Sequence, residues 1–164
     1  MKNPDMKQQL VQLGNGAHVL AMQILGNTDD AIDAVHDAYV KVMKKPGSYK
    51  SVNGPLAPWF MRIVRNHCID MLRRRRPSTS QVDELHDAGP GPDRLLEIEQ
   101  RDLGLQKALR ALSSDQRQII ILRDYLDMSY VEIASVLDIA KGTVMSRLHR
   151  ARLALKEELS RYDH

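Results

Sequence analysis

Apolar residues recur every three or four positions along nearly the whole chain, and the period-two alternation of strands is scarce. We therefore expect an all-α protein. The clearest interruption runs from Pro77 to Pro92, where proline, glycine and serine are frequent and acidic residues are interspersed. Such a segment buries too little apolar surface to order itself and is typical of a flexible linker. The pattern predicts two small helical domains, residues 1–76 and 94–164, joined by a linker at residues 77–93.

Three periodic segments make up the first domain. Residues 10–25 predict a weak helix, because Gly14 and Gly16 each lower helix stability and can mark a bend or a break. A second helix is expected from the N-cap signal at Asn27 to about Lys45, and a third from Trp59 to about Arg76, after a loop at residues 46–58. The residues expected to be buried are Ala31, Ile32, Val35, Ala38, Tyr39, Val42 and Met43 in the second helix and Phe60, Ile63, Val64, His67, Cys68, Met71 and Leu72 in the third.

The second helix carries an acidic row. Asp29, Asp33 and Asp37 are spaced four residues apart, which places their carboxylates on one exposed helix face. The first two could simply complement the helix dipole, but Asp37 lies beyond the first turn. Spacing alone leaves two equal interpretations, dipole compensation and an acidic docking surface for a basic partner.

The third helix is basic outside its apolar stripe. Arg62, Arg65, Asn66 and Arg73 lie off that stripe, and four consecutive arginines end the helix at residues 73–76. Basic residues near a helix C-terminus interact favourably with the dipole, and Pro77 stops the helix. Four arginines exceed what that role needs, which favours a contact with nucleic acid.

The second domain predicts a helix-turn-helix. A helix is expected at residues 93–110, and a capping box at Ser113 and Gln116 opens the next. A second capping box, Ser129 with Glu132, starts the first helix of the motif, and residues 138–140 are the expected turn. Of the arginines in the preceding helix, Arg117 either reaches DNA phosphates or is solvated, and we expect Arg123 to be solvated.

The helix that begins at Lys141 has the features of a recognition helix. Its apolar positions repeat at helical spacing, and no acidic residue occurs between Lys141 and Lys156. Arginine can bind guanine through two hydrogen bonds, and any lysine or arginine can displace counterions from phosphates. Gly142 would let the main chain approach DNA closely. An ordinary amphipathic hairpin with a solvated charged face is the alternative, which the combined signals disfavour.

Composition and missing motifs exclude several classes of protein. The chain has 164 residues and a formal net charge of +3, so the segregation of its charges matters more than their sum. Cys68 is the only cysteine, which excludes an internal disulfide, and its neighbour His67 points to a different helix face, so no metal site is expected. We find no catalytic constellation, no phosphate loop, no signal peptide and no membrane segment, and expect a cytoplasmic, non-enzymatic protein without a cofactor.

These segments together resemble a known family. DDAIDAVHDAYV at residues 29–40, PWFMRIVRNHCIDMLRRR at 58–75, and SYVEIA at 129–134 followed by KGTVMSRLHRAR at 141–152 are similar to the bacterial sigma-70 family, specifically its short extracytoplasmic-function (ECF) group. Order and separation match from about Leu20 onward. The resemblance implies a region 2 type helical bundle and a region 4 type helix-turn-helix.

The resemblance also implies partners and contacts for this chain. The acidic row of Asp29, Asp33 and Asp37 would dock on the clamp helices of the largest subunit of core RNA polymerase. The other implied contacts are with promoter DNA, at the −10 element through Arg62, Arg65, Asn66 and Arg73 and at the −35 element through Lys141, Thr143, Ser146, Arg147 and Arg150. Members of this group are commonly held inactive by an anti-sigma factor, so such a partner is expected here, and no membrane insertion of this chain is expected.

Three features depart from the family pattern. His36 replaces a common glutamine, Met145 lies where many members carry a basic residue, and the helix before Gly26 contains two glycines and no aromatic residue.

Two other classes of protein remain open on the sequence alone. One is a stand-alone dimeric helix-turn-helix regulator, although no heptad seam follows Leu155. The other is an interaction protein that sequesters a basic partner through the acidic helix, which would leave two basic helices unexplained.

Overall fold

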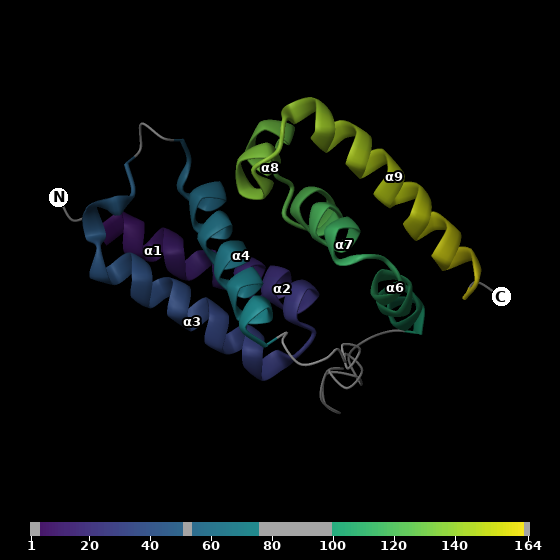
Figure 1. Ribbon diagram of the computed structural model, residues 1–164, viewed down its shortest axis with the longest axis horizontal. Helices are drawn as coiled ribbons and strands as arrows, with labels where there is room; N and C mark the ends of the chain where they lie inside the picture. Colours follow the sequence, from purple (N-terminus) through teal and green to yellow (C-terminus); the bar gives the residue numbers. More distant parts are fainter. Residues whose placement is uncertain (1–3, 51–53, 76–99, 163–164) are drawn as a thin grey trace. The chain divides into compact units, whose positions relative to one another are not determined.

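A computed structural model describes residues 4–50, 54–75 and 100–162. These residues form helices and short connections, and no strand occurs among them (Figure 1). The all-α prediction is confirmed. The chain divides into two compact units, one built mainly from the helices before residue 76 and the other mainly from those after residue 99. The predicted linker at residues 77–93 and both its boundaries lie outside the described residues.

The first unit consists of α1 (Pro4–Gln12), α2 (Gly14–Leu25), α3 (Thr28–Lys44), a 3-10 turn η1 (Pro46–Ser48) and α4 (Leu56–Arg75). Helices α2, α3 and α4 pack against one another, and α1 contacts α2 and α4. The centre of this bundle is closed by side chains that are almost fully buried, among them Leu10, Leu20, Val42, Phe60, Met61 and Val64.

The helix predicted over residues 10–25 is divided into α1 and α2 at Leu13. Tyr39 of α3 reaches this junction, where its hydroxyl donates a hydrogen bond of 2.6 Å to the carbonyl of Leu10. A Cβ at residue 14 would lie 2.9 Å from that hydroxyl, so the glycine makes room for it. The ring of Tyr39 also stacks on Phe60, with 5.1 Å between the centroids. The glycine break expected from sequence is therefore a tertiary contact point.

The start of α3 follows the predicted cap. The side chain of Asn27 accepts a hydrogen bond of 2.9 Å from the Asp30 amide, and the helix ends at Lys44, before Pro46. Two of its expected core positions are wrong, since Ile32 and Met43 are 53% and 45% exposed. The alanines of α3 allow close packing against α2 and α4, and this rotates the buried face toward Ala31, Ala34, Val35, Ala38 and Val42.

Helix α4 begins at Leu56, three residues before the predicted start, which corrects the proposed loop end. Pro58 is then the third residue of the helix, where its missing N–H costs nothing because first-turn amides have no intrahelical partner. Met61 is buried although the stripe prediction omitted it, and Leu72, predicted buried, is 37% exposed. The other stripe positions are buried or half-buried, namely Phe60, Ile63, Val64, His67, Cys68 and Met71.

The second unit consists of α6 (Gln100–Ala111), α7 (Ser114–Ile120), one turn of π-helix η4 (Ile121–Tyr125), α8 (Tyr130–Leu137) and α9 (Lys141–Ser160). Both α6 and α7 pack on α9. The capping box at Ser113 and Gln116 is confirmed, with both of its reciprocal hydrogen bonds present. The first residues of the helix predicted at 93–110 lie outside the described residues. The core includes Ala108, Ile119, Leu122, Ile133, Val144 and Leu148.

Candidate DNA-binding and protein-binding surfaces

The helix-turn-helix is formed by α8, a short turn and α9. The Ser129 hydroxyl accepts a hydrogen bond of 3.1 Å from the Glu132 amide, and the Ser129 amide donates one of 2.9 Å to the Glu132 carboxylate. This is the capping box predicted from sequence. Asp138 turns the chain after α8 with a φ of 59°, a conformation that aspartate tolerates better than most residues. The local sequence therefore sets both the start of α8 and its end.

Helix α9 separates an apolar face from a basic one. Val144, Leu148 and Ala151 are buried against the rest of the second unit. Four of the predicted −35 residues are exposed and Thr143 is half-buried; the exposed ones are Lys141, Ser146, Arg147 and Arg150. Within the described part of the chain neither Arg147 nor Arg150 has an ion-pair partner. Their charges are thus available to an external anion.

The N-terminus of α9 is open. Ala140 is its N-cap and provides no side-chain hydrogen bond, and no acidic residue occupies the first turn. First-turn amides and the helix dipole favour an anion at such an end. A Cβ at Gly142 would meet no atom within 4 Å, so nothing inside the fold requires this glycine.

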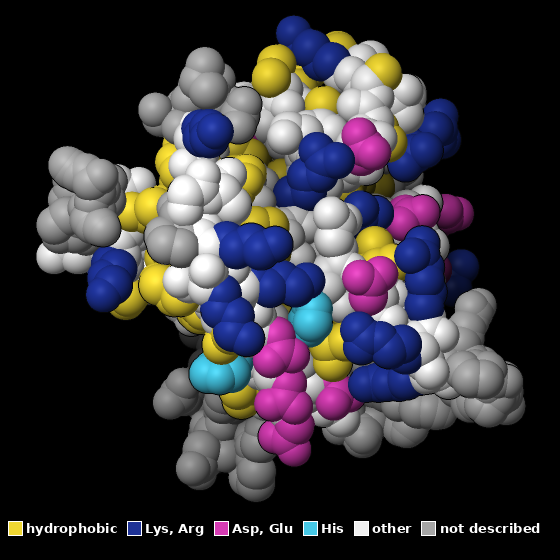
Figure 2. Space-filling model, turned by 60° about the vertical axis from the view of Figure 1, so that its left-hand side comes forward, with side chains coloured by type: hydrophobic (Ala, Val, Ile, Leu, Met, Phe, Trp, Pro, Cys, Tyr) yellow, Lys and Arg dark blue, Asp and Glu magenta, His cyan; other side chains and the backbone are white. Residues whose placement is uncertain are grey.

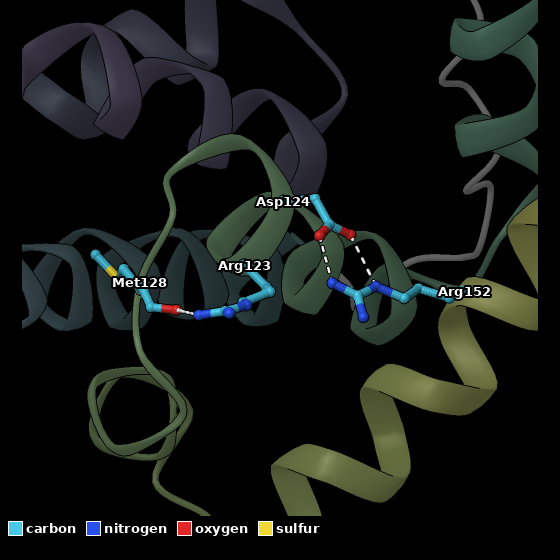
Figure 3. Close-up of polar contacts among 4 residues, drawn as sticks. All are labelled: Arg123, Asp124, Met128 and Arg152. Carbon is cyan, nitrogen blue, oxygen red and sulfur yellow. Dashed lines mark hydrogen bonds and ion pairs between the residues drawn. The ribbon is translucent and has the colours of Figure 1, made fainter.

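Two arginines and an aspartate brace the segment that leads from α7 to α8 (Figure 3). Arg123 donates a hydrogen bond of 2.7 Å to the carbonyl of Met128 and lies 5.0 Å from the ring centre of Tyr130. The expectation that Arg123 is merely solvated is therefore wrong. Asp124 accepts two hydrogen bonds from the guanidinium of Arg152, one of them 3.1 Å long from Nε. This bidentate pair ties η4 to α9 and raises the pKa of Arg152, chiefly through the hydrogen bond.

Arg117 also has an internal role. Its guanidinium donates a hydrogen bond of 2.6 Å to the carbonyl of Leu112, at the end of α6, and burial lowers its pKa. A lysine or arginine that satisfies free carbonyls at a helix C-terminus stabilises that end. Neither of the interpretations considered from sequence, a phosphate contact or simple solvation, describes this side chain.

In the first unit, the predicted −10 residues lie on the side of α4 away from its buried stripe. Arg62 and Arg65 are half-buried, and Asn66 and Arg73 are exposed. Arg73 lies 3.5 Å from Asp70 of the same helix. The end of the arginine run is partly used within the fold, because Arg75 forms an ion pair of 2.9 Å with Asp30 of α3. Arg76 lies outside the described residues.

The acidic row on α3 is exposed as predicted at Asp29, Asp33 and Asp37. Figure 2 shows acidic side chains gathered on one face of the molecule, with lysines and arginines on both sides of them. Asp29 and Asp33 have no ion-pair partner within the described residues, whereas the carboxylate of Asp37 lies 3.0 Å from Nε2 of His67.

Sequence reasoning missed an exposed apolar stripe beside this row. Ile32, Val40 and Met43 are 53%, 37% and 45% exposed, and His36 between them is exposed as well. Residues 32, 36, 40 and 43 are spaced by three or four positions, so they share a face of α3. Ile32 and His36 each lie one position before an aspartate of the row, and Val40 and Met43 continue the same spacing toward the end of the helix, a periodicity that the sequence shows. The α3 surface therefore combines carboxylates with apolar side chains.

The described residues contain no cluster of histidine, cysteine and acidic side chains that could hold a metal ion. Cys68 is fully buried, and burial raises the pKa of its thiol to about 12. Among those same residues, none of the helices combines the length and apolarity that a membrane crossing requires.

Comparison with known proteins defines the class. Residues 11–78 match the family model described as Sigma-70 region 2, and residues 102–155 match the one described as Sigma-70, region 4. The ECF RNA polymerase sigma factor SigM of Mycobacterium tuberculosis is 34% identical over 138 residues, which cover 84% of this chain and 68% of SigM. The chain belongs to the ECF group of sigma-70 family RNA polymerase sigma factors, as its sequence motifs indicated.

Two further relatives differ in their coverage. SigE of Mycolicibacterium smegmatis, also an ECF sigma factor, is 29% identical over 164 residues; the match covers 97% of this chain but 63% of SigE. This chain therefore spans less than two thirds of that relative. The sigma factor RpoE of Bartonella quintana, solved in complex with the anti-sigma factor NepR, is 28% identical with a TM-score of 0.72, and the match covers 99% of this chain and 100% of RpoE.

Proposed function

We propose that this chain is an alternative sigma factor that binds core RNA polymerase and directs transcription initiation from specific promoters by recognising their −10 and −35 elements. The observation that carries the proposal is the pairing of two surfaces on separate units. One is a helix-turn-helix on which Arg147 and Arg150 have no ion-pair partner among the described residues, and the other is the exposed acidic row of α3. A protein that only bound DNA would gain nothing from that acidic surface, since phosphates repel it.

The α3 surface supports docking to polymerase. Asp29, Asp33 and Asp37 complement a basic partner, and the neighbouring Ile32 and Met43 supply apolar area that such a partner can cover. Charge complementarity steers association and fixes register, while the apolar contacts contribute most of the affinity. An amphipathic helical element with basic residues fits this surface, and the clamp helices of the largest polymerase subunit are the element we propose.

The two basic surfaces support promoter recognition. On α9, Arg147 and Arg150 would read base edges in the major groove of the −35 element, with Lys141, Thr143 and Ser146 contacting bases or phosphates. On α4, Arg62, Arg65, Asn66 and Arg73 would contact the −10 element, where stacking or pocketing of flipped bases supplies part of the melting energy. The chain recruits and positions and performs no covalent step, so the proposed role is not enzymatic.

The proposed organisation of the chain has three parts. Residues 1–76 are the docking and −10 domain, residues 94–164 the −35 domain, and residues 77–93 the linker between them. The family matches support these limits, since the first ends at residue 78 and the second begins at residue 102. A linker between the two DNA-binding domains lets them span the distance between the −10 and −35 elements.

Regulation by a dedicated protein is part of the proposal. The relative RpoE was solved with the anti-sigma factor NepR, and we propose that an anti-sigma factor likewise binds this chain. The site of action is the bacterial cytoplasm, where the polymerase works.

The test is binding followed by transcription. Purified chain is used to capture bacterial core RNA polymerase, and the complex is then supplied with fragmented genomic DNA of the host for run-off transcription. Capture together with new, specific transcripts is the expected result. A folded, inhibitor-free chain that captures no polymerase but binds symmetric DNA as a dimer in gel filtration would instead be a stand-alone regulator.

A further inference from the structure

The contact between His67 and Asp37 joins α4, for which we propose contacts with the −10 element, to α3, for which we propose polymerase docking. His67 lies on α4 and Asp37 on the acidic row of α3, 30 positions apart in the sequence, and Nε2 lies 3.0 Å from Oδ2. An ionised carboxylate can only accept, so Nε2 carries the hydrogen and donates. Its acceptor is ionised, and a hydrogen bond to an ionised group is stronger than one between neutral groups.

The exposures of the two partners differ greatly. The side chain of His67 is 11% exposed and that of Asp37 is 51% exposed. The imidazole is therefore part of the packed interior of the bundle, while half of the carboxylate remains open to solvent. A rigid buried donor holds an exposed acceptor that belongs to a binding surface.

Packing alone does not account for a histidine at residue 67. The position belongs to the buried stripe of α4, next to Val64 and Cys68, where an aliphatic side chain would fill the space without burying polar nitrogens. Burying a polar group costs free energy unless it finds a hydrogen-bond partner, and here that partner is supplied by the surface row. Asp29 and Asp33, the other two aspartates of the row, have no such partner among residues 4–50, 54–75 and 100–162.

We infer that His67 is a positioning residue for polymerase docking, fixing the carboxylate of Asp37 in the orientation that the basic partner meets. The inference rests on the proposed function of the α3 surface. Without the bond, the Asp37 side chain would sample its other rotamers and would have to be ordered on binding, which weakens the complex. Arg75 holds Asp30 near the other end of the α3 and α4 pairing, so two carboxylates of α3 are held by α4.

The experiment is a double-mutant cycle on the full chain, with affinity for core RNA polymerase as the measurement. His67→Leu keeps the packing and removes the donor, His67→Gln retains a donor of similar reach, and Asp37→Ala removes the acceptor together with its charge. We expect His67→Leu to weaken binding by about 3- to 10-fold, His67→Gln to restore part of that loss, and His67→Leu to have little further effect when Asp37 is already Ala.

Each other outcome overturns the inference for a different reason. Equal losses from His67→Leu and His67→Gln that simply add to the loss from Asp37→Ala would mean that the histidine only stabilises the bundle, and thermal unfolding of each variant would register this. Unchanged affinity in His67→Leu would mean that Asp37 needs no orientation. Failure of the wild-type chain to bind polymerase would refute the proposed function itself, and the inference with it.

Discussion

The hydroxyl of Tyr39 occupies the space that a side chain at residue 14 would need. A Cβ there would lie 2.9 Å from the hydroxyl oxygen, which is bonded to the Leu10 carbonyl. We expect Gly14→Ala to lower the free energy of unfolding of the first unit by about 1–2 kcal/mol, because the bond breaks or the helices shift. The fluorescence of Trp59, the only tryptophan, reports this unit during denaturation.

Tyr39→Phe provides the matched control. Removing the hydroxyl loses one hydrogen bond, at about 1 kcal/mol, but also removes the atom with which the new Cβ would collide. In that background Gly14→Ala should cost much less, or even stabilise the helix start by up to about 1 kcal/mol, since alanine has the higher helix propensity. Equal costs in both backgrounds would mean that the glycine has no connection with Tyr39.

Substitution of Gly142 should affect DNA affinity and the free energy of unfolding in different ways. Its neighbourhood is open, and Gly142→Ala replaces a poor helix former near the start of α9. We expect the unfolding free energy to stay the same or rise by up to about 1 kcal/mol, while affinity for −35 DNA falls because a methyl group then stands between the main chain and the phosphates. Band-shift titration and thermal unfolding measure the two effects. Undiminished affinity would place DNA away from this turn.

Substitutions in the two binding surfaces should impair separate activities, −35 recognition on α9 and polymerase binding on α3. Arg147→Ala combined with Arg150→Ala is expected to abolish −35-dependent transcription and leave polymerase binding intact, since both side chains are exposed and neither has an ion-pair partner in the part of the chain that the structure describes. Reversal of charge at Asp33 and Asp37 should do the opposite, weakening polymerase capture by tenfold or more, on the order of 1.4 kcal/mol, with −35 binding unchanged. Loss of both activities in either variant would indicate misfolding or a shared surface.

The bidentate pair between Asp124 and Arg152 should contribute modestly to the second unit. The side chains are 43% and 47% exposed, so solvent screens the attraction. We expect Asp124→Ala or Arg152→Ala to cost about 0.5–1 kcal/mol, with little extra cost when the two are combined. Hydrogen exchange of the amides of α7 and α9 reports the loss. A full additive cost in the double variant would show that the two residues act separately.

The contribution of Cys68 to the free energy of unfolding should fall as the pH rises. Its thiol has a pKa of about 12 in the folded protein, against about 8.5 in an unfolded chain. The folded state therefore keeps a proton that the unfolded chain releases, so the contribution of this group to stability is complete below about pH 8.5 and is lost as the pH rises toward 12.

The comparison is wild type against Cys68→Ala between about pH 9 and pH 11. The wild-type unfolding free energy should fall more steeply, by up to about 1.4 kcal/mol for each pH unit. At pH 8 a thiol reagent should label Cys68 only as fast as the first unit opens. Rapid labelling of the folded chain would contradict the burial of the thiol.

Local sequence signals predicted much of this structure, because their physics is local. The capping boxes at Ser113 and Ser129, the cap at Asn27 and the start of α9 each depend on residues within one helical turn. The acidic row and the outward face of α9 also followed from helical periodicity alone.

What the sequence could not predict depends on contacts between distant residues. Periodicity allowed Ile32 to be buried, and only the close packing of the α3 alanines against neighbouring helices turns it outward. His67 and Asp37 are 30 positions apart, and Asp124 and Arg152 are 28 apart. No short-range sequence pattern indicates that either pair is in contact. The internal roles of Arg117 and Arg123 were likewise hidden, because a basic residue on an amphipathic helix resembles a solvated one.

The pairing of Arg152 with Asp124 bears on how DNA binding would respond to ionic strength. Each phosphate neutralised by a protein cation releases counterions and adds about −0.9 to the slope of log affinity against log salt concentration. Arg152 already has its counter-charge within the fold, whereas no described residue pairs with Lys141, Arg147 or Arg150. The contribution of α9 to that slope is then about −2.7 rather than about −3.6, and a carboxylate in the scaffold thereby sets how strongly promoter binding varies with salt.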